Sequence, residues 1–547
     1  MFTRFADIFK IFVCLGCLCL VAPLFLTQYL YAQKTPVKAW DQIIGGTNSD
    51  LVGGLMQTPD GGYILGSYSK SGIGGDKSQA NRGQEDYWII KLNANGIKMW
   101  DKTYGGSSWD YLSCLIPTAD GGYLVGGTSL SGITGDKTQA FKGMSDMWVL
   151  KLDANGNKIW DKTIGGNRGD GIYAMLQTPD GGFLLGGSSY SDVGLDKSQP
   201  NRGPNNTDDF WLVKLDAQGN KLWDKTLGGS DADILRTMEP TTDGGYILGG
   251  GTESGISGEK SEAARGQEDY WVVKVDAMGN KQWDKTFGGS GNDSFAEVRQ
   301  TSDGGYIVGG YSRSPLGADK SEPSLGNDDA WILKLDSAGN KIWDKTIGAA
   351  GYDWLYSLQQ TQDGGFILGI RSDSGIGGHK TEPNKGTSDD YWLVKLDATG
   401  SKHWDKSFGG NYSDILINMS QTTDGGYIMA GNIYYSTGGD VTGTSKGSND
   451  LWLVKTTADP LGMPEMKDVS RLVVYPNPGQ GKFQIAFNGW NAEQITLTVS
   501  DILGRRILVQ QVPSTQIATL QLPPAKGIYL LQVTHKQGSI TKRIVVE

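Results

Sequence analysis

Aspartates recur in this chain at a nearly constant interval, each shortly after a Gly-Gly or Gly-Ala pair. Carboxylate oxygens are preferred ligands of Ca²⁺, and a ring of them could also bind sugar hydroxyls. In the structural alternative, each aspartate caps its own turn by accepting hydrogen bonds from nearby backbone N–H groups. Repetition in every copy favours the structural alternative and leaves Ca²⁺ as the candidate ion. The residues are Asp50, Asp110, Asp170, Asp233, Asp293, Asp353 and Asp414.

A few aromatic residues beside these aspartates depart from the repeat. Most of the 17 tryptophans recur at repeated positions and are expected to pack in the interior. Trp109 precedes Asp110, whereas Tyr352 and Trp354 flank Asp353. An aromatic ring found in only some copies can stack on a sugar ring, or it can be an ordinary half-buried side chain. The candidate ligand-binding residues are therefore Trp109, Asp110, Tyr352, Asp353 and Trp354.

Residues arranged for catalysis are sparse. The three histidines, His379, His403 and His535, form no cluster with the spacing of a zinc site, and no serine nucleophile stands in a strained strand-to-helix turn of the Gly-x-Ser-x-Gly type. A pair of carboxylates for glycoside cleavage would be spatial and cannot be read from spacing; the nearest group is Glu253, Glu259 and Glu262. We predict no catalytic residue and no cofactor, apart from the candidate Ca²⁺.

These residues belong to a unit that is repeated seven times. The interval between copies is 60 to 63 residues, measured from the Asp-Gly-Gly signals at Asp60, Asp120, Asp180, Asp243, Asp303, Asp363 and Asp424. A fixed period of this kind indicates a repeat architecture. In the second copy, four short runs rich in β-branched and aromatic residues are separated by Asp-Gly and Asn-Gly turns, as in antiparallel hairpins. The runs are 112–118, 122–129, 146–153 and 157–165.

Seven four-stranded units predict an all-β fold in which residues 38–456 form a seven-bladed β-propeller. A Trp-Asp motif marks the fourth strand, and a copy at Trp40-Asp41 precedes the first blade, while the last blade lacks one. We expect residues 38–46 to become the outer strand of blade seven, which removes two unpaired sheet edges. This topology places tight hairpin turns on one face and long loops on the other, where binding is expected.

The first 32 residues predict a secretory signal peptide, with Arg4 and Lys10 before an apolar run and Tyr31-Ala32 at the cleavage point. The alternative is an uncleaved anchor helix. With 50 basic and 60 acidic side chains, the chain has a net charge of −10, which argues against a nucleic-acid partner. Residues 457–470 contain two prolines and predict a linker before a separate small β-sandwich at 471–547.

The motifs of this last segment resemble the C-terminal sorting domain of type IX secretion (Por secretion system) cargo in Bacteroidetes. They include Val-Tyr-Pro-Asn-Pro, Asp-Ile-Leu-Gly-Arg, Lys-Gly-Ile-Tyr and a terminal Lys-Arg-Ile-Val-Val, and the seven-fold part is similar in rhythm to short-repeat bacterial propellers. The resemblance implies recognition by the type IX machinery and commonly attachment to surface lipopolysaccharide. The matching motif residues are Pro476, Asn477, Pro478, Gly481, Asp501, Gly504, Gly527, Tyr529 and Lys542.

Two functional hypotheses follow. The favoured one is a monomeric, non-enzymatic propeller that passes through the periplasm and across the outer membrane. It would be released or displayed on the cell surface, meet a membrane only through that attachment, and bind a glycan, a protein or matrix through its long-loop face. The alternative is a carbohydrate-active enzyme with carboxylates at the mouth of the propeller channel.

Overall fold

The computed structural model describes residues 35–203, 207–459, 472–487, 495–501, 506–513, 518–522, 526–535 and 538–546. These residues form β-strands joined by turns and loops, and the chain divides into two compact units, which we describe separately. The predicted signal peptide lies outside the described residues, and so does most of the predicted linker.

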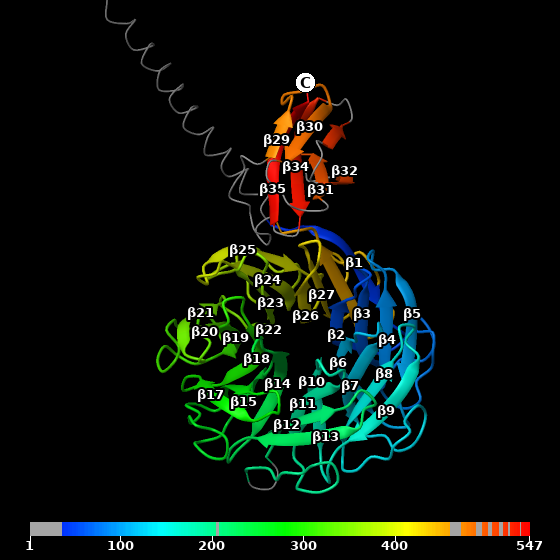
Figure 1. Cartoon of the computed structure of the whole chain (residues 1–547), viewed down its shortest axis with the longest axis vertical. Helices are drawn as coiled ribbons and strands as arrows, with labels where there is room; N and C mark the ends of the chain where they lie inside the picture. Colours follow the sequence, from blue (N-terminus) through cyan, green and yellow to red (C-terminus); the bar gives the residue numbers. More distant parts are fainter. Residues whose placement is uncertain are drawn as a thin grey trace, which may run out of the picture. The chain divides into compact units, whose positions relative to one another are not determined.

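In the first unit, seven four-stranded antiparallel sheets are arranged as blades around one axis (Figure 1). The innermost strands are β2 (Asp50–Gln57), β6 (Asp110–Pro117), β10 (Asp170–Gln177), β14 (Asp233–Pro240), β18 (Asp293–Gln300), β22 (Asp353–Gln360) and β26 (Asp414–Gln421). The second strands are β3 (Tyr63–Ser69), β7 (Tyr123–Ser129), β11 (Phe183–Ser189), β15 (Tyr246–Thr252), β19 (Tyr306–Ser312), β23 (Phe366–Ser372) and β27 (Tyr427–Ile433). The third strands are β4 (Asp86–Leu92), β8 (Asp146–Leu152), β12 (Asp209–Leu215), β16 (Asp269–Val275), β20 (Asp329–Leu335), β24 (Asp390–Leu396) and β28 (Asp450–Thr456). The outer strands are β5 (Lys98–Tyr104), β9 (Lys158–Ile164), β13 (Lys221–Leu227), β17 (Lys281–Phe287), β21 (Lys341–Ile347), β25 (Lys402–Phe408) and β1 (Lys38–Ile44).

The hairpin turns take the form that their residues predict. In the turn between β6 and β7, Gly121 has a φ of +82°, and the Asp120 carboxylate accepts a hydrogen bond from Gly122 N at 3.1 Å. In the turn between β8 and β9, one oxygen of Asp153 accepts the N–H groups of Asn155 and Asn157, each at 2.8 Å. Because the turns are this short, consecutive strands pair directly and each repeat closes as one sheet.

A buried tryptophan on the third strand ties each blade together. The indole N–H of Trp88 donates to Asp101 Oδ2 on the outer strand at 3.0 Å, and the equivalent bond measures 3.0–3.2 Å in all seven blades. The same Asp101 oxygen accepts the backbone N–H of Ser78 from the long loop at 2.9 Å. The Trp-Asp motif thus fixes the third strand, the outer strand and the long loop to one another.

Glycines on the second strand allow neighbouring segments to approach closely. A Cβ at Gly126 would lie 2.7 Å from Met175 Sδ of the next blade. A Cβ at Gly127 would lie 1.9 Å from Tyr111 O on the adjoining strand β6. Larger side chains at these positions would push the segments apart.

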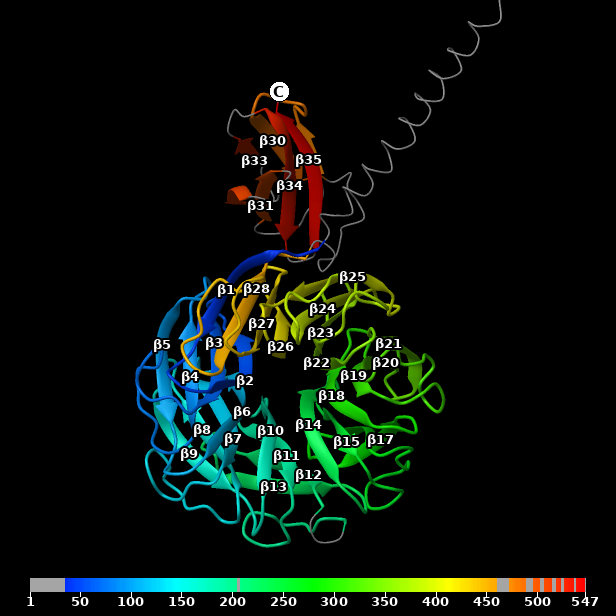
Figure 2. The ribbon, with the colours of Figure 1, turned by 180° about the vertical axis from the view of Figure 1, so that it is seen from behind.

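The predicted closure of the ring is confirmed, because β1 pairs antiparallel with β28 and completes blade seven. Figure 2 shows β1, in dark blue, beside the orange strand β28. Asp41 takes the place of Asp101 in this blade: it accepts the Trp452 indole N–H at 3.2 Å and Thr442 N at 2.9 Å. Residues from the two ends of the propeller therefore form the same interior contacts as residues within one repeat.

The second unit contains two small antiparallel sheets that share one apolar core. Leu472, Phe483, Leu497 and Leu531 are among the buried residues of this core, which agrees with the predicted sandwich. One sheet has the strand order β29 (Leu472–Tyr475), β30 (Lys482–Phe487) and β33 (Ala518–Gln521). The other has the order β32 (Arg506–Val512), β31 (Ile495–Asp501), β34 (Gly527–His535) and β35 (Gly538–Val546).

Deleting residues 35–44 is expected to destabilise the propeller and to cause self-association. The deletion removes the buried side chains of Ile43 and Ile44, which should cost at least about 3 kcal/mol, and it leaves β28 as an unpaired edge. Thermal unfolding and size-exclusion chromatography measure both effects, with a chain that lacks only residues 1–34 as the control. A deletion variant that melts like this control and stays monomeric would contradict the role of β1.

Candidate functional site

The seven repeated aspartates lie at the first residue of each innermost strand, not in the crossover loops, and all are buried. Asp110 illustrates their contacts: its Oδ2 accepts Gly106 N at 2.7 Å and the Ser131 hydroxyl at 2.9 Å. An oxygen of each other member likewise accepts the N–H of the residue four positions earlier, at 2.6–2.7 Å. This geometry is that of the structural alternative, in which the carboxylate fixes the local backbone.

The repeated lysine of the long loops is also an interior residue. Lys77 is buried, its Nζ lies 5.7 Å from the Trp88 ring centroid, and its ammonium faces the charges of Asp50 and Asp86. Burial lowers the pKa of Lys77 to about 8 and raises the pKa of Asp86 to about 6. In each of the first six blades, one buried loop lysine therefore lies close to these two buried carboxylates.

Blade seven departs from this arrangement. Val441 stands where the other blades have the lysine, and Ile433 stands between Asp414 and Asp450 where they have serine or threonine. Burial, together with the charge of Asp390, raises the pKa of Asp414 to about 7. Asp414 and Asp450 of blade seven therefore lack the buried lysine that lies close to the equivalent carboxylates of the other blades.

The aromatic candidates separate into a cluster and a single residue. Tyr352 and Trp354 contact each other with ring centroids 5.2 Å apart, and Tyr311 lies 5.9 Å from Trp354. Asp353, between them in sequence, is buried and points away from any ligand surface into its own serine contacts. Trp109 is 41% exposed but belongs to blade two, where Asp110 is likewise buried. The structure therefore brings together Tyr352 and Trp354 from the predicted set.

Charged residues that sequence reasoning missed complete this cluster. The Arg371 guanidinium lies 4.5 Å from the Trp354 ring centroid, and the Trp354 indole N–H donates to Asp328 at 3.0 Å. Arg313 binds both oxygens of Asp328, at 2.8 and 3.0 Å. We call Tyr311, Arg313, Asp328, Tyr352, Trp354 and Arg371 the blade-six aromatic surface. A comparison of repeat positions could have identified Asp328, because the residue before the third strand is acidic in five of the seven copies.

Three more exposed tyrosines lie on the same face at the neighbouring blade. Tyr412 comes from the crossover into β26, and Tyr434 and Tyr435 come from the loop after β27; they are 58%, 38% and 62% exposed. Together with Ser388 and Ser413 they line a hollow. Tyr435 has a φ of +47°, a backbone conformation that is uncommon for a non-glycine residue. Their departure from the repeat was the signal that could have identified them.

The acids of the long loop in blade four hold their neighbours in place. Both oxygens of Glu259 contact Arg202, at 2.7–3.1 Å. Glu262 contacts Lys285 at 3.2 Å and accepts Thr286 N at 3.0 Å. These contacts do not bring Glu259 and Glu262 together as a pair facing a substrate.

The motif residues of the C-terminal sandwich tie the first turn to the last strand. Asn477 Oδ1 accepts Val545 N at 2.9 Å, and Lys542 Nζ donates to Leu472 O at 2.8 Å. Gly481 has a φ of +83°, Asp501 pairs with Tyr529 across β31 and β34, and Gly527 begins β34. Pro476 and Pro478 flank Asn477 in the turn, while Gly504 lies outside the described residues.

In the described part of the chain, no three or more His, Cys, Asp or Glu side chains are grouped so that they could hold a metal ion. Nor do the described residues include an apolar helix of membrane-spanning length.

Comparisons with known proteins give a family match for the C-terminal unit and more distant similarities for the larger part of the chain. Residues 473–547 match the family model described as a secretion system C-terminal sorting domain, which confirms the predicted sorting domain. The sequence is 24% identical over 383 residues to the regulatory protein FlaEY of Caulobacter vibrioides; the match covers 66% of this chain and 38% of that protein. The chain thus spans less than half the length of this relative.

Solved structures with a similar arrangement include the WD40 domain of Neurospora crassa Pan2. The TM-score is 0.41 at 8% identity, over 78% of this chain and 96% of that one. A mutant of the Synechocystis apocarotenoid oxygenase has a TM-score of 0.35 at 11% identity, over 90% of this chain and 98% of that one.

The propeller is expected to be more stable in mildly acidic than in neutral solution. The pKa of Asp209 and of Asp414 is raised from 3.8 to about 7, so the folded state binds protons that the unfolded chain releases. The free energy of unfolding therefore falls as the pH rises from about 4 through about 7. Thermal unfolding at about pH 5.5 and 7.5 measures this slope, which Asp414→Asn should reduce and Asp192→Asn, at a half-exposed carboxylate, should not. A midpoint that rises with pH in this interval would contradict the prediction.

Ca²⁺ and EDTA are expected to leave the midpoint of thermal unfolding unchanged. The repeated aspartates already accept hydrogen bonds from backbone and serine groups in the interior. A ligand that binds only the folded state raises the midpoint by mass action. A rise with Ca²⁺ that EDTA reverses would instead identify these aspartates as ion sites.

Proposed function

We propose, for this seven-bladed β-propeller exported by type IX secretion to the cell surface or extracellular space, a non-catalytic function in binding. The ligand is an extracellular glycan, and it binds the blade-six aromatic surface on the long-loop face. The observation that carries the proposal is Trp354, a tryptophan that the other six blades lack at this position, in contact with the Tyr352 ring, the Arg371 guanidinium and Asp328.

The chemistry of this surface suits a sugar. Pyranose rings present apolar C–H faces that stack on aromatic side chains, and their hydroxyls need hydrogen-bond donors and acceptors around the rim. Tyr352 is 37% exposed, so its ring is accessible. Arg313 is half-exposed and, with its ion pair to Asp328, supplies such donors and acceptors beside the rings.

The tyrosines of blade seven extend the same face. Tyr412, Tyr434 and Tyr435 line their hollow on the crossover and long loop of the next blade. A chain of several sugar units has the length to contact both groups, which a monosaccharide lacks. Protein or matrix ligands remain the other outcomes of the binding test.

The enzyme hypothesis required an asymmetric pair of acids on a long loop. Glu259 and Glu262, the nearest candidates in the sequence, are held by Arg202 and Lys285. Product release from a panel of polysaccharides, abolished by a single acid-to-amide substitution, would favour that hypothesis over ours.

Trp354→Ala is expected to weaken binding of oligosaccharides by at least about fivefold, because loss of a stacked aromatic ring costs about 1 kcal/mol or more. Glycan arrays identify the ligand, and isothermal titration calorimetry with the best oligosaccharide measures the affinity. Trp109→Ala, at the exposed tryptophan of blade two, is the matched control and should bind like the parent. No binding on glycan and protein arrays, or equal affinity of both variants, would refute the proposal.

A further inference from the structure

A cavity of about 450 Å³ lies inside the propeller among the innermost strands. Its lining comes from the second halves of these strands, such as Leu55–Gln57 of β2 and Met419–Gln421 of β26. The hairpin turns follow directly, so the cavity lies in the half of the channel next to the short-turn face and away from the long loops. It is therefore separate from the surface to which the glycan is assigned.

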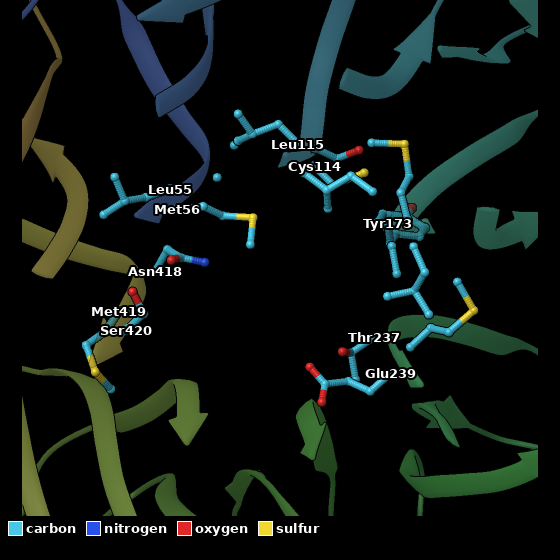
Figure 3. A pocket seen from close by; sticks show the side chains of 18 of the residues that line it. Leu55, Met56, Cys114, Leu115, Tyr173, Thr237, Glu239, Asn418, Met419 and Ser420 are labelled. Atoms are coloured by element: carbon cyan, nitrogen blue, oxygen red, sulfur yellow. The ribbon is translucent and has the colours of Figure 1, made fainter. Parts of the chain in front are cut away.

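The wall of this cavity is apolar on one side and polar on the other. The seventh residue of each innermost strand is Met56, Ile116 or Leu176 in the first three blades, and Glu239, Arg299, Gln359 or Ser420 in the remaining four. All seven belong to the cavity lining. Figure 3 shows Met56 and Asn418 on one side and Glu239 on the other, with their side chains directed into the same space.

On the polar side, two carboxylates share one guanidinium group. Arg299 forms ion pairs with Glu239 and with Glu297, two residues before it on the same strand. The second oxygen of Glu297 accepts Leu358 N at 2.5 Å, so this acid is engaged in the wall. Glu239 is itself a lining residue, and of the residues that line the cavity only Glu239 and Arg299 are charged.

We propose that this cavity binds a small organic cation, a primary ammonium group on an apolar body. The ammonium group contacts the Glu239 carboxylate, which balances the excess negative charge, and the apolar body lies against Met56, Ile116 and Leu176. The two sides of the cavity decide the class of ligand: an apolar wall opposite two carboxylates that share one guanidinium group suits neither a sugar nor an anion.

The groups around Glu239 predict how binding depends on pH. Arg299 and Glu297 of β18 face it. Arg236, on the same strand as Glu239, lies 5.6 Å from the ring centroid of Tyr173 on the neighbouring strand β10. Burial raises the pKa of Glu239 to about 7, with Arg299 lowering it and Glu297 raising it. Since the ammonium group binds the ionised carboxylate, affinity should rise as the pH rises through about 7.

The test uses three probes of similar size on the full-length folded protein at about pH 8: 2-phenylethylammonium, neutral 2-phenylethanol and anionic 3-phenylpropanoate. Ligand-observed NMR and calorimetry should give the tightest binding for the ammonium probe, about tenfold tighter than for the alcohol. Its affinity should fall between pH 8 and pH 6, where 2-phenylethanol should show no change. Tightest binding of the carboxylate, equal binding of all three probes, or no binding at millimolar concentration would overturn the proposal.

Two variants locate the site. Glu239→Gln should weaken binding of 2-phenylethylammonium by about tenfold and remove the pH dependence, whereas Glu253→Gln on a long loop should do neither. Met56→Lys, on the opposite wall, keeps Glu239 and its ion pair and should abolish binding, with Met99→Lys on the exposed outer strand as its control. Unchanged affinity in Met56→Lys, with thermal unfolding showing that the variant is folded, would refute the assignment even if Glu239→Gln proved unstable.

Discussion

The hydrogen bond from a buried indole to an aspartate on the outer strand is the interaction on which the propeller depends. In each blade it joins the third strand to the outer strand, and the same carboxylate receives a backbone N–H from the long loop, as Asp101 does from Trp88 and Ser78. A buried carboxylate needs such donors, because leaving it unpaired costs several kcal/mol. One aspartate per blade therefore sets the position of an edge strand, a core residue and a loop together.

Many other charged residues of this chain are also buried, because they too hold a loop against a strand. Lys77 reaches the Trp88 ring and the charges of two aspartates from a loop that looks solvated in the sequence. The repeated charged motifs consequently maintain the scaffold in every blade, and the residues that vary between blades are left to provide specificity. Tyr352, Trp354 and Arg371 on the long-loop face, and Glu239 and Arg299 in the channel, belong to this variable set.

The fold could be predicted from the sequence because its determinants are local and repeated seven times. Turn residues, strand alternation and the Trp-Asp motif lie within one period, and the extra copy at Trp40-Asp41 indicated the closure. The environment of the aspartates could not be read in this way: Asp110 seemed to belong to a crossover loop, yet it begins β6 and pairs with Ser129 across the sheet. Arg371 lies opposite Trp354 across the β22–β23 hairpin, and Asp328 reaches Trp354 from the preceding blade. Both contacts depend on strand register and blade packing, which the residue pattern alone did not give. Glu239 and Arg299 lie one repeat period apart, so equivalent positions of neighbouring blades become neighbours in the channel wall.

Because β1 completes blade seven, the ring can close only when every blade of the propeller is present. Asp41 and Thr442 are separated by 401 residues, yet their hydrogen bonds belong to one blade. A chain that has been synthesised only as far as blade six has nothing for β1 to pair with, and it keeps an exposed strand edge at its beginning. Only a polypeptide that extends through β28, close to the sorting domain in sequence, can bury that edge. A truncated product would remain open and accessible to proteases, so ring closure separates finished molecules from unfinished ones.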